Sequence, residues 1–583
     1  MAERRGFGEK GRAIVPLAVV LLAIVTVLAW PAWAQAPIRV DTATVEQDSL
    51  RFEGERALTY VRDFVTRFPN RASGRPANEA SADYLLEHFA SLGAECIVDR
   101  WQVVNYGAPV ELRNVVCELS GSRAEAIVLV AHHDASPAAV QAADNDGSGI
   151  GVLMHLAEVL AAEPQRRYGL VFLAADGEEY GMLGTRRFVS RYGAERLLAG
   201  VSLDNLGKFF YDGLDIDGRG QFRGYAPLWL QRLVQDAAVA AGEATTPRIA
   251  APIDQLLAQA IPISFMDEGP LVAAGVPAVG LAGHVPPEFA QLHWDTYHNP
   301  DDTLVLQAAE PLGHVGRVTE ALVAALQAAE AVPYERGPYL LTGAGRVVRG
   351  TPLRLVFATV VAAFALIAAL RWRAALRAGE SGWIAAVTRL ASLWLALLAS
   401  VGLLYLLVAL GMLDAWELYP ATSKDPALTS PRWPGLVAWA VGTAIALWTS
   451  WRLAGWCLRG MPKPCPRVAS VLSFTVLSAA AAAIATTVPF ALIFVVPTLA
   501  WTAIGARQRL GRLADVALLL SGGAVVFAML YVMGFQVLRI GPYILWYLAM
   551  MFSGGMIAFP AAALIVAIVA AGLALVVPRY ARR

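Results

Sequence analysis

The chain has 583 residues, more than one ordinary domain needs, and 57% of them are hydrophobic, which is high for a protein that folds in water. The net charge is formally zero but unevenly divided: residues 351–583 carry 18 Lys and Arg against 5 Asp and Glu, and residues 1–350 carry 29 against 42. A basic excess beside apolar segments is typical of the cytoplasmic loops of membrane proteins, so we do not expect nucleic-acid binding.

The first segment, residues 1–36, has the pattern of an export signal. Basic residues precede an apolar run at 14–30, and Ala32-Trp33-Ala34 then resembles a cleavage site. The run is also near the length of about 20 residues that spans a bilayer, so an uncleaved signal anchor is the alternative. Both interpretations send the following domain out of the cytoplasm.

Residues 37–345 are predicted to form an α/β domain. Apolar residues at helical spacing predict helices at 77–92 and 149–162. Strand-like runs lie at 96–104 and 110–119, on either side of a turn at 106–109, and short apolar runs at 126–131 and 170–175 are typical of buried strands. Strands that alternate with helices favour a mostly parallel central sheet flanked by helices, with its site at the carboxyl ends of the strands.

The first polar stretch that carries chemistry is Ala131-His132-His133-Asp134, at the end of an apolar run. Residues two apart on a strand share a face, so His132 and Asp134 are expected to point the same way. Asp134 could then accept a hydrogen bond from the far nitrogen of a metal-bound His132. His133 is the alternative ligand, but strand alternation and Asp134 favour His132.

Four more polar stretches follow in order, and alone each could be an ordinary capping loop or solvated turn. The one that directly follows the run at 170–175 lies where α/β enzymes keep their sites. The stretches are Ala143-Asp144-Asn145-Asp146-Gly147-Ser148-Gly149, Asp176-Gly177-Glu178-Glu179-Tyr180-Gly181, Ser202-Leu203-Asp204-Asn205-Leu206-Gly207 and Tyr297-His298-Asn299-Pro300-Asp301-Asp302-Thr303-Leu304.

The four cysteines lack zinc-finger spacing, so a metal would be held by His, Asp and Glu. Cys96 and Cys117 lie almost opposite each other across the predicted hairpin. Cross-strand neighbours can meet disulfide distances, and an exported domain is oxidised, so we predict a Cys96–Cys117 disulfide. Cys457 and Cys465 are expected to be free thiols.

Residues 346–583 are predicted to form an all-α membrane domain of about eight transmembrane helices. Apolar stretches lie at 353–370, 391–413, 434–451, 468–485, 488–505, 514–537, 541–558 and 560–577. Basic loops at 371–377, 452–467 and 507–512 alternate with a loop that contains acidic residues, which predicts cytoplasmic basic loops and an extracytoplasmic front domain. The number of spans decides the side of the C-terminus and stays open. The scarcity of ionisable residues within the spans favours an anchor or scaffold over a transporter.

In this order and at these separations, the five stretches resemble the signature of the M28 family of zinc aminopeptidases. Arg71-Ala72-Ser73-Gly74-Arg75 is similar to that family's N-terminal region, and the resemblance covers about residues 55–330. With its membrane half, the chain is similar to the branch of membrane-anchored endoplasmic reticulum metallopeptidases and vacuolar membrane proteases.

The resemblance implies two zinc ions and a role for each residue of the site. One ion would be bound by His132 and Asp204 and the other by Glu179 and His298, with Asp144 as the bridge, Glu178 as general base and Asp134 as the partner of His132. Such oxygen and nitrogen ligands suit a hydrolytic zinc site with an open position.

Some of these assignments have rivals. Asp146 could replace Asp144, although the spacing to Gly147-Ser148-Gly149 favours Asp144, and His293 could replace His298, although Asp302-Thr303-Leu304 follows only the latter at the family's spacing. The sequence departs from a common family pattern at Met266-Asp267-Glu268, where Ser-Asp-His is often seen. The histidines in helical patterns, His88, His155 and His314, are interpreted as structural.

We therefore expect an integral membrane metallopeptidase that hydrolyses N-terminal residues from peptides with a two-zinc-activated water. Its catalytic domain would be periplasmic in a bacterium or luminal in a eukaryote. Its expected partners are peptide substrates and the lipid bilayer. The alternatives are a single-zinc enzyme like the glutaminyl cyclases, and a non-catalytic membrane scaffold.

Overall fold

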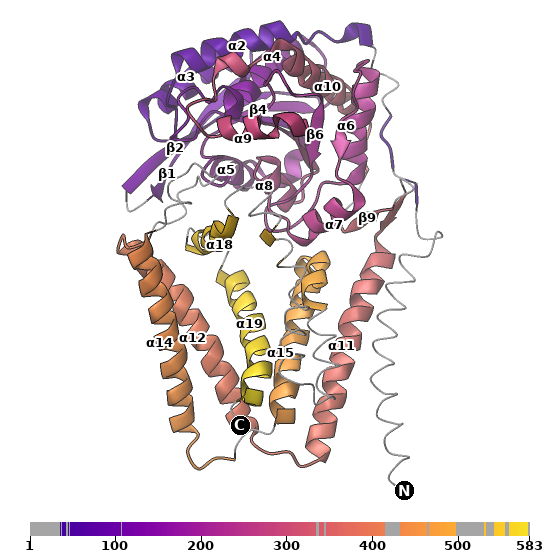
Figure 1. The fold of residues 1–583 in the computed structure, drawn as a ribbon. Coiled ribbons are helices and arrows are strands. Elements are labelled where there is room, and N and C mark those ends of the chain that lie inside the picture. The colour runs from indigo at the N-terminus through magenta and orange to yellow at the C-terminus, as the bar shows by residue number, and fades with distance from the viewer. Residues whose placement is uncertain are drawn as a thin grey trace. The chain divides into compact units, whose positions relative to one another are not determined.

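The structure is a computed structural model that describes residues 35–36, 38–41, 45, 47–105, 108–333, 337–342, 346–413, 432–462, 466–496, 527, 530–531, 541–553 and 559–580. The chain divides into two compact units, Gln35–Val347 and a second that contains Val348–Arg583. Figure 1 draws the helices and strands of both units. The expected export signal, apart from residues 35 and 36, lies outside the described residues.

The first unit is built on a sheet whose strand order, within the described residues, is β1-β2-β4-β3-β5-β8-β6-β7. The four central strands β4, β3, β5 and β8 pair in parallel, whereas β1 and β2 join one edge antiparallel and β6 pairs antiparallel with β8. The predicted mostly parallel sheet is thus confirmed. The strands are β1 Glu95–Asn105, β2 Ala108–Leu119, β3 Ala126–His132, β4 Gly169–Ala175, β5 Leu197–Leu203, β6 Leu214–Asp217, β7 Arg248–Ile249 and β8 Ala278–Gly283, with a separate pair β9 Tyr339–Leu341 and β10 Val347–Arg349.

Helices cover both faces of this sheet. Helix α4 packs on β3 and β5 with α2 and α10 against it, and α8 packs on β5 and β8 beside α5. In Figure 1 the first group lies above the sheet and the second below it. The helices are α2 Gly54–Arg67, α3 Pro76–Ser91, α4 Gly149–Ala161, α5 Leu183–Tyr192, α6 Leu228–Ala240, α7 Pro252–Ala260, α8 Glu268–Ala273, α9 Ala290–Thr296 and α10 Ala309–Ala328.

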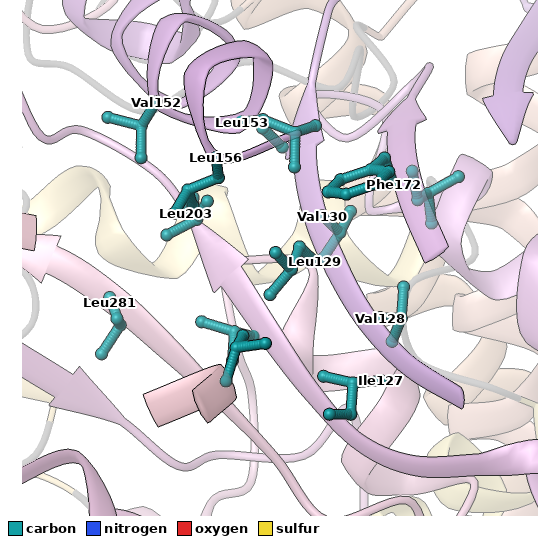
Figure 2. Packing of buried hydrophobic residues seen from close by; sticks show 14 of the residues in the cluster. Ile127, Val128, Leu129, Val130, Val152, Leu153, Leu156, Phe172, Leu203 and Leu281 are labelled. Carbon is teal, nitrogen blue, oxygen red and sulfur yellow. The ribbon is translucent and has the colours of Figure 1, made fainter. Parts of the chain in front are cut away.

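Strand β3 is the centre of the core because apolar side chains cover both of its faces. Residues 127–130 have no exposed surface, and Figure 2 shows Val130 near Leu153 of α4 and Phe172 of β4. Each such side chain contributes roughly 1.5–3 kcal/mol on burial. This packing fixes the point where β3 ends and the first polar residues of the site begin.

The edge hairpin β1–β2 carries the predicted disulfide. Cys96 lies opposite Cys117 in the strand register, and the two are bonded, so this prediction is confirmed. Cys457 is a free, exposed cysteine, as expected. Cys465 and two residues of the predicted turn, 106 and 107, lie outside the described residues.

The second unit is helical. Four of its helices are long and apolar enough to cross a membrane, in the part of the chain that the structure describes: Thr351–Arg377, Trp383–Ala409, Trp433–Cys457 and Arg467–Thr487. They coincide with the first four predicted spans. The predicted spans at 488–505 and 514–537 fall mostly outside the described residues, so the total of about eight stays a prediction. The helices are α11 Thr351–Arg377, α12 Trp383–Ala409, α14 Trp433–Cys457, α15 Pro466–Thr487, α18 Ile544–Ser553 and α19 Phe559–Tyr580.

Candidate metal centre

Three neighbouring parallel strands deliver polar side chains to one edge of the sheet. Strand β3 ends at His132, β4 is followed by Glu178, and β5 is followed by Asp204. Because β4, β3 and β5 run in parallel, their carboxyl ends meet. His132 Nε2 lies 3.8 Å from Glu178 Oε2 and 3.9 Å from Asp204 Oδ1. All three side chains are buried.

Asp134 lies beside His132, although β3 ends at His132 and Asp134 follows the strand rather than lying on it. Its Oδ1 lies 3.3 Å from His132 Nδ1, which leaves Nε2 directed at Glu178 and Asp204. The Asp134 carboxylate also accepts the backbone N–H groups of Glu178 and Glu179 at 3.2 and 3.3 Å. Burial opposes ionisation of Asp134, but its hydrogen bond to His132 and the nearby imidazoles lower its pKa below the usual value.

His133, the alternative ligand, lies away from this group. Its Nδ1 is 3.0 Å from Ser81 Oγ and its Nε2 is 2.8 Å from the Arg113 carbonyl oxygen. Burial lowers its pKa to about 4, which suits a neutral ring held by hydrogen bonds. The structure therefore gives His133 a packing role.

A second pair of side chains lies beside the first group. His298 Nε2 is 3.0 Å from Glu179 Oε2, and both residues are buried. His298 has a backbone φ of 55°, in the left-handed region that non-glycine residues rarely adopt. Such conformations persist where surrounding structure enforces them and often mark functional sites. The rival His293 is instead near Tyr211, with Nδ1 3.4 Å from its hydroxyl.

Asn145 occupies the centre between the two groups, a role that we did not predict. Its Oδ1 lies 3.0 Å from His132 Nε2, and its Nδ2 lies 2.9 Å from Glu179 Oε1 and 2.6 Å from His298 Nε2. The sequence offered no signal for this position, because Asn145 lies in a kinked segment at 143–148 whose backbone departs from a helix at residues 145 and 146.

Asp144, expected as the bridge, is not brought to this centre. Its Oδ1 accepts the Gly207 N–H at 2.9 Å, and its Oδ2 accepts the Tyr211 hydroxyl at 2.6 Å. The buried ammonium of Lys208 lies 3.4 Å from the same Oδ2. Asp302 accepts the backbone N–H groups of residues 144 and 145 at 2.9 and 3.1 Å, which fixes this loop.

Asp146, the rival of Asp144, lies on the His132 side. It accepts the backbone N–H of His132 at 3.1 Å and that of Gly149 at 2.9 Å. Donor atoms of His132, Asp146 and Asp204 lie within 4.8 Å of one another, which makes them a group among the described residues that could hold a metal ion.

The crowding of carboxylates shows that this donor set fits a cation. Burial raises the pKa of Asp204 to about 7 and the pKa values of Asp146 and Glu178 well above their usual range, and each of the three gains a further increase from a neighbouring carboxylate. A bound cation would relieve both effects. Imidazole and carboxylate ligands without thiolates suit zinc. Such a donor set is typical of metal-dependent hydrolases.

Residues 114–323 match the model of Peptidase family M28, which confirms the resemblance seen in the motifs. The alkaline phosphatase isozyme conversion protein of Escherichia coli (strain K12) is 29% identical over 26% of this chain and 51% of the relative. The probable lipoprotein aminopeptidase LpqL of Mycobacterium tuberculosis is 32% identical over 19% of this chain and 24% of the relative. The vacuolar membrane protease of Lachancea thermotolerans is 31% identical over 22% of this chain and 14% of the relative.

The chain thus spans about half the length of the first relative and less of the other two. Among solved structures, a glutaminyl cyclase of Porphyromonas gingivalis is similar, with 21% identity over 47% of this chain and 98% of that chain and a TM-score of 0.39. A Zn-dependent exopeptidase of Parabacteroides distasonis has 19% identity over 47% of this chain and 99% of that chain, with a TM-score of 0.40.

Proposed function

We propose that this chain is a membrane-anchored, zinc-dependent aminopeptidase that hydrolyses N-terminal residues from peptides. The observation that carries the proposal is the convergence of His132, Glu178 and Asp204 at the ends of three parallel strands within the region that matches Peptidase family M28. The four apolar helices and the vacuolar membrane protease among the relatives support the membrane anchor.

Two groups of residues would hold zinc. His132 and Asp204, with Asp146 nearby, form one group, and Glu179 with His298 forms the other. Zinc bound there would lower the pKa of a water molecule and polarise the peptide carbonyl. The expectation of two ions also needs an anionic side chain shared by both groups, and Asp144 is turned toward Lys208 and Tyr211 instead.

Glu178 is proposed as the general base and acid. Its carboxylate faces His132, whereas the adjacent Glu179 faces His298. Glu178 would take a proton from the attacking water as the water oxygen bonds to the carbonyl carbon. It would then deliver that proton to the amine nitrogen as the C–N bond breaks. Asp134 is a positioning residue, because it holds the His132 ring and the backbone N–H groups of both glutamates.

The test compares peptides with free and acetylated N-termini, using the purified full chain in detergent with zinc. An aminopeptidase releases free amino acids from the first set and leaves the acetylated set intact. Equal cleavage of both sets, or internal cleavage, would contradict the proposal.

The second candidate is a glutaminyl cyclase-like enzyme, which is expected to need a single zinc ion. The neutral amide of Asn145 at the centre of the site favours one ion over two. A peptide that begins with glutamine separates the two activities. Hydrolysis releases free glutamine, whereas cyclisation releases ammonia and leaves a pyroglutamyl peptide. A non-catalytic scaffold would produce neither.

A further inference from the structure

The centre of the candidate site is occupied by an amide. Asn145 contacts His132 on one side and both Glu179 and His298 on the other, at distances of 2.6–3.0 Å. Asn145 is buried, with 3% of its surface exposed. Any ion in either group would therefore lie beside the Asn145 side chain.

An amide cannot do what a carboxylate would do at this position. A carboxylate has two anionic oxygens, and each can bind one of two neighbouring cations, whereas an amide has one neutral oxygen and an NH₂ group that only donates. Glu179, when ionised, can only accept hydrogen bonds, so the NH₂ group must face Glu179 and His298. The oxygen is then left for the His132 side.

No neighbouring carboxylate in the loop replaces the missing one. Asp144 is held by two hydrogen-bond donors, the Gly207 N–H and the Tyr211 hydroxyl, and by an ion pair with the fully buried Lys208 ammonium. Asp146 accepts two backbone N–H groups on the His132 side. The loop thus contributes carboxylate oxygen to one group of donors and an amide NH₂ to the other.

We infer, on the basis of the proposed zinc dependence but independently of the substrate, that the two groups bind metal unequally. One zinc ion is held tightly by the group of His132, Asp146 and Asp204, with the Asn145 oxygen adjacent. The pair Glu179–His298 binds a second ion weakly, because that ion must displace the Asn145 NH₂ group and gains no shared anion.

The experiment counts zinc by mass spectrometry in the full chain after exchange through a weak chelator. The wild type is expected to retain about one zinc per chain and Asn145→Asp about two, because the added carboxylate supplies the shared anion. Glu179→Gln should retain about one, and His132→Ala should lose it. The matched control Asn299→Asp adds the same charge at a buried residue that contacts Tyr297, and it should retain about one.

A wild type that retains two ions would overturn the inference, as would a folded Asn145→Asp that retains one. If Asn145→Asp does not fold, the variants Glu179→Gln and His132→Ala still test the inference. Loss of the retained zinc from Glu179→Gln but not from His132→Ala would overturn it. A wild type that retains none contradicts both this inference and the proposed zinc dependence. Retention of one ion without peptide turnover would contradict the proposed aminopeptidase and support the unequal groups.

Discussion

The adjacent residues Glu178 and Glu179 face different parts of the candidate site. Glu178 Oε2 lies 3.8 Å from His132 Nε2, and Glu179 Oε2 lies 3.0 Å from His298 Nε2. Replacing Glu178 with Gln keeps its shape and removes its base, so we expect turnover to fall by roughly 10²–10⁴-fold with retained zinc unchanged. Glu179→Gln should instead raise the zinc concentration needed for full activity. Zinc titrations of peptide hydrolysis measure both effects.

The opposite pattern would exchange these roles. If Glu178→Gln lost the retained zinc while Glu179→Gln titrated like the wild type, Glu178 would be the ligand. Full activity in both variants would place the reaction elsewhere.

Residues at strand ends could be predicted from the sequence, whereas the centre of the site could not. His132, Glu178 and Asp204 each follow a short apolar run, and parallel strands bring such positions together. Asn145 instead depends on a loop that Asp302, far along the chain, holds by two backbone hydrogen bonds. Because Asp302 holds the backbone of this loop from far along the chain, the local spacing could not show which side chain faces the site. The spacing favoured Asp144 instead.

At the scale of elements, helices α2 and α4 are joined by a polar cluster around Glu158. Its carboxylate accepts hydrogen bonds from Arg56 at 2.7 Å and from the Tyr60 hydroxyl, and lies 3.0 Å from His155 Nδ1. Burial opposes ionisation of Glu158, but these three partners lower its pKa to about 2.

This cluster predicts a loss of stability in acid. The pKa of Glu158 is lower in the folded state than its ordinary value of 4.5, so its contribution is full above pH 4.5 and is lost as the pH falls toward 2. We expect Glu158→Gln to lower the free energy of unfolding by roughly 1–2 kcal/mol at pH 7 and by less at pH 3. Urea unfolding at several pH values measures this difference.

The matched control is Glu163→Gln. Glu163 pairs with Arg51, and both side chains are half exposed, so little change is expected at any pH. An equal effect of the two substitutions would show that Glu158 contributes no more than a surface charge.

The elements that were predicted from the sequence are those with clear local patterns. The predicted helices at 77–92 and 149–162 correspond to α3 and α4, and the four predicted strands correspond to β1, β2, β3 and β4. Strands β5, β6, β7 and β8 were not predicted; β6 and β7 are only four and two residues long and depend on pairing within the sheet. Short segments of this kind have no periodicity of their own.

For the whole molecule, the charges at the helix ends predict a topology. Arg371, Arg373 and Arg377 lie in the last turns of α11. Arg452 lies in α14 before its last turn, and Arg459 lies just after the end of that helix. Basic residues favour the cytoplasmic side, so we expect the unit that precedes α11 to be exported. An alkaline phosphatase fusion after Tyr334 should be active, and one after Arg459 should be inactive. The reverse result would invert the topology.

Because the β1–β2 hairpin carries a disulfide, the redox state of the compartment in which the protein is produced affects its stability. A chain synthesised in a reducing compartment would carry thiols at Cys96 and Cys117 and would lack the cross-link at the edge of the sheet. Losing a native disulfide from a small domain typically costs about 2–5 kcal/mol. Protein produced in a reducing cytosol would therefore be less stable than protein secreted by the same host.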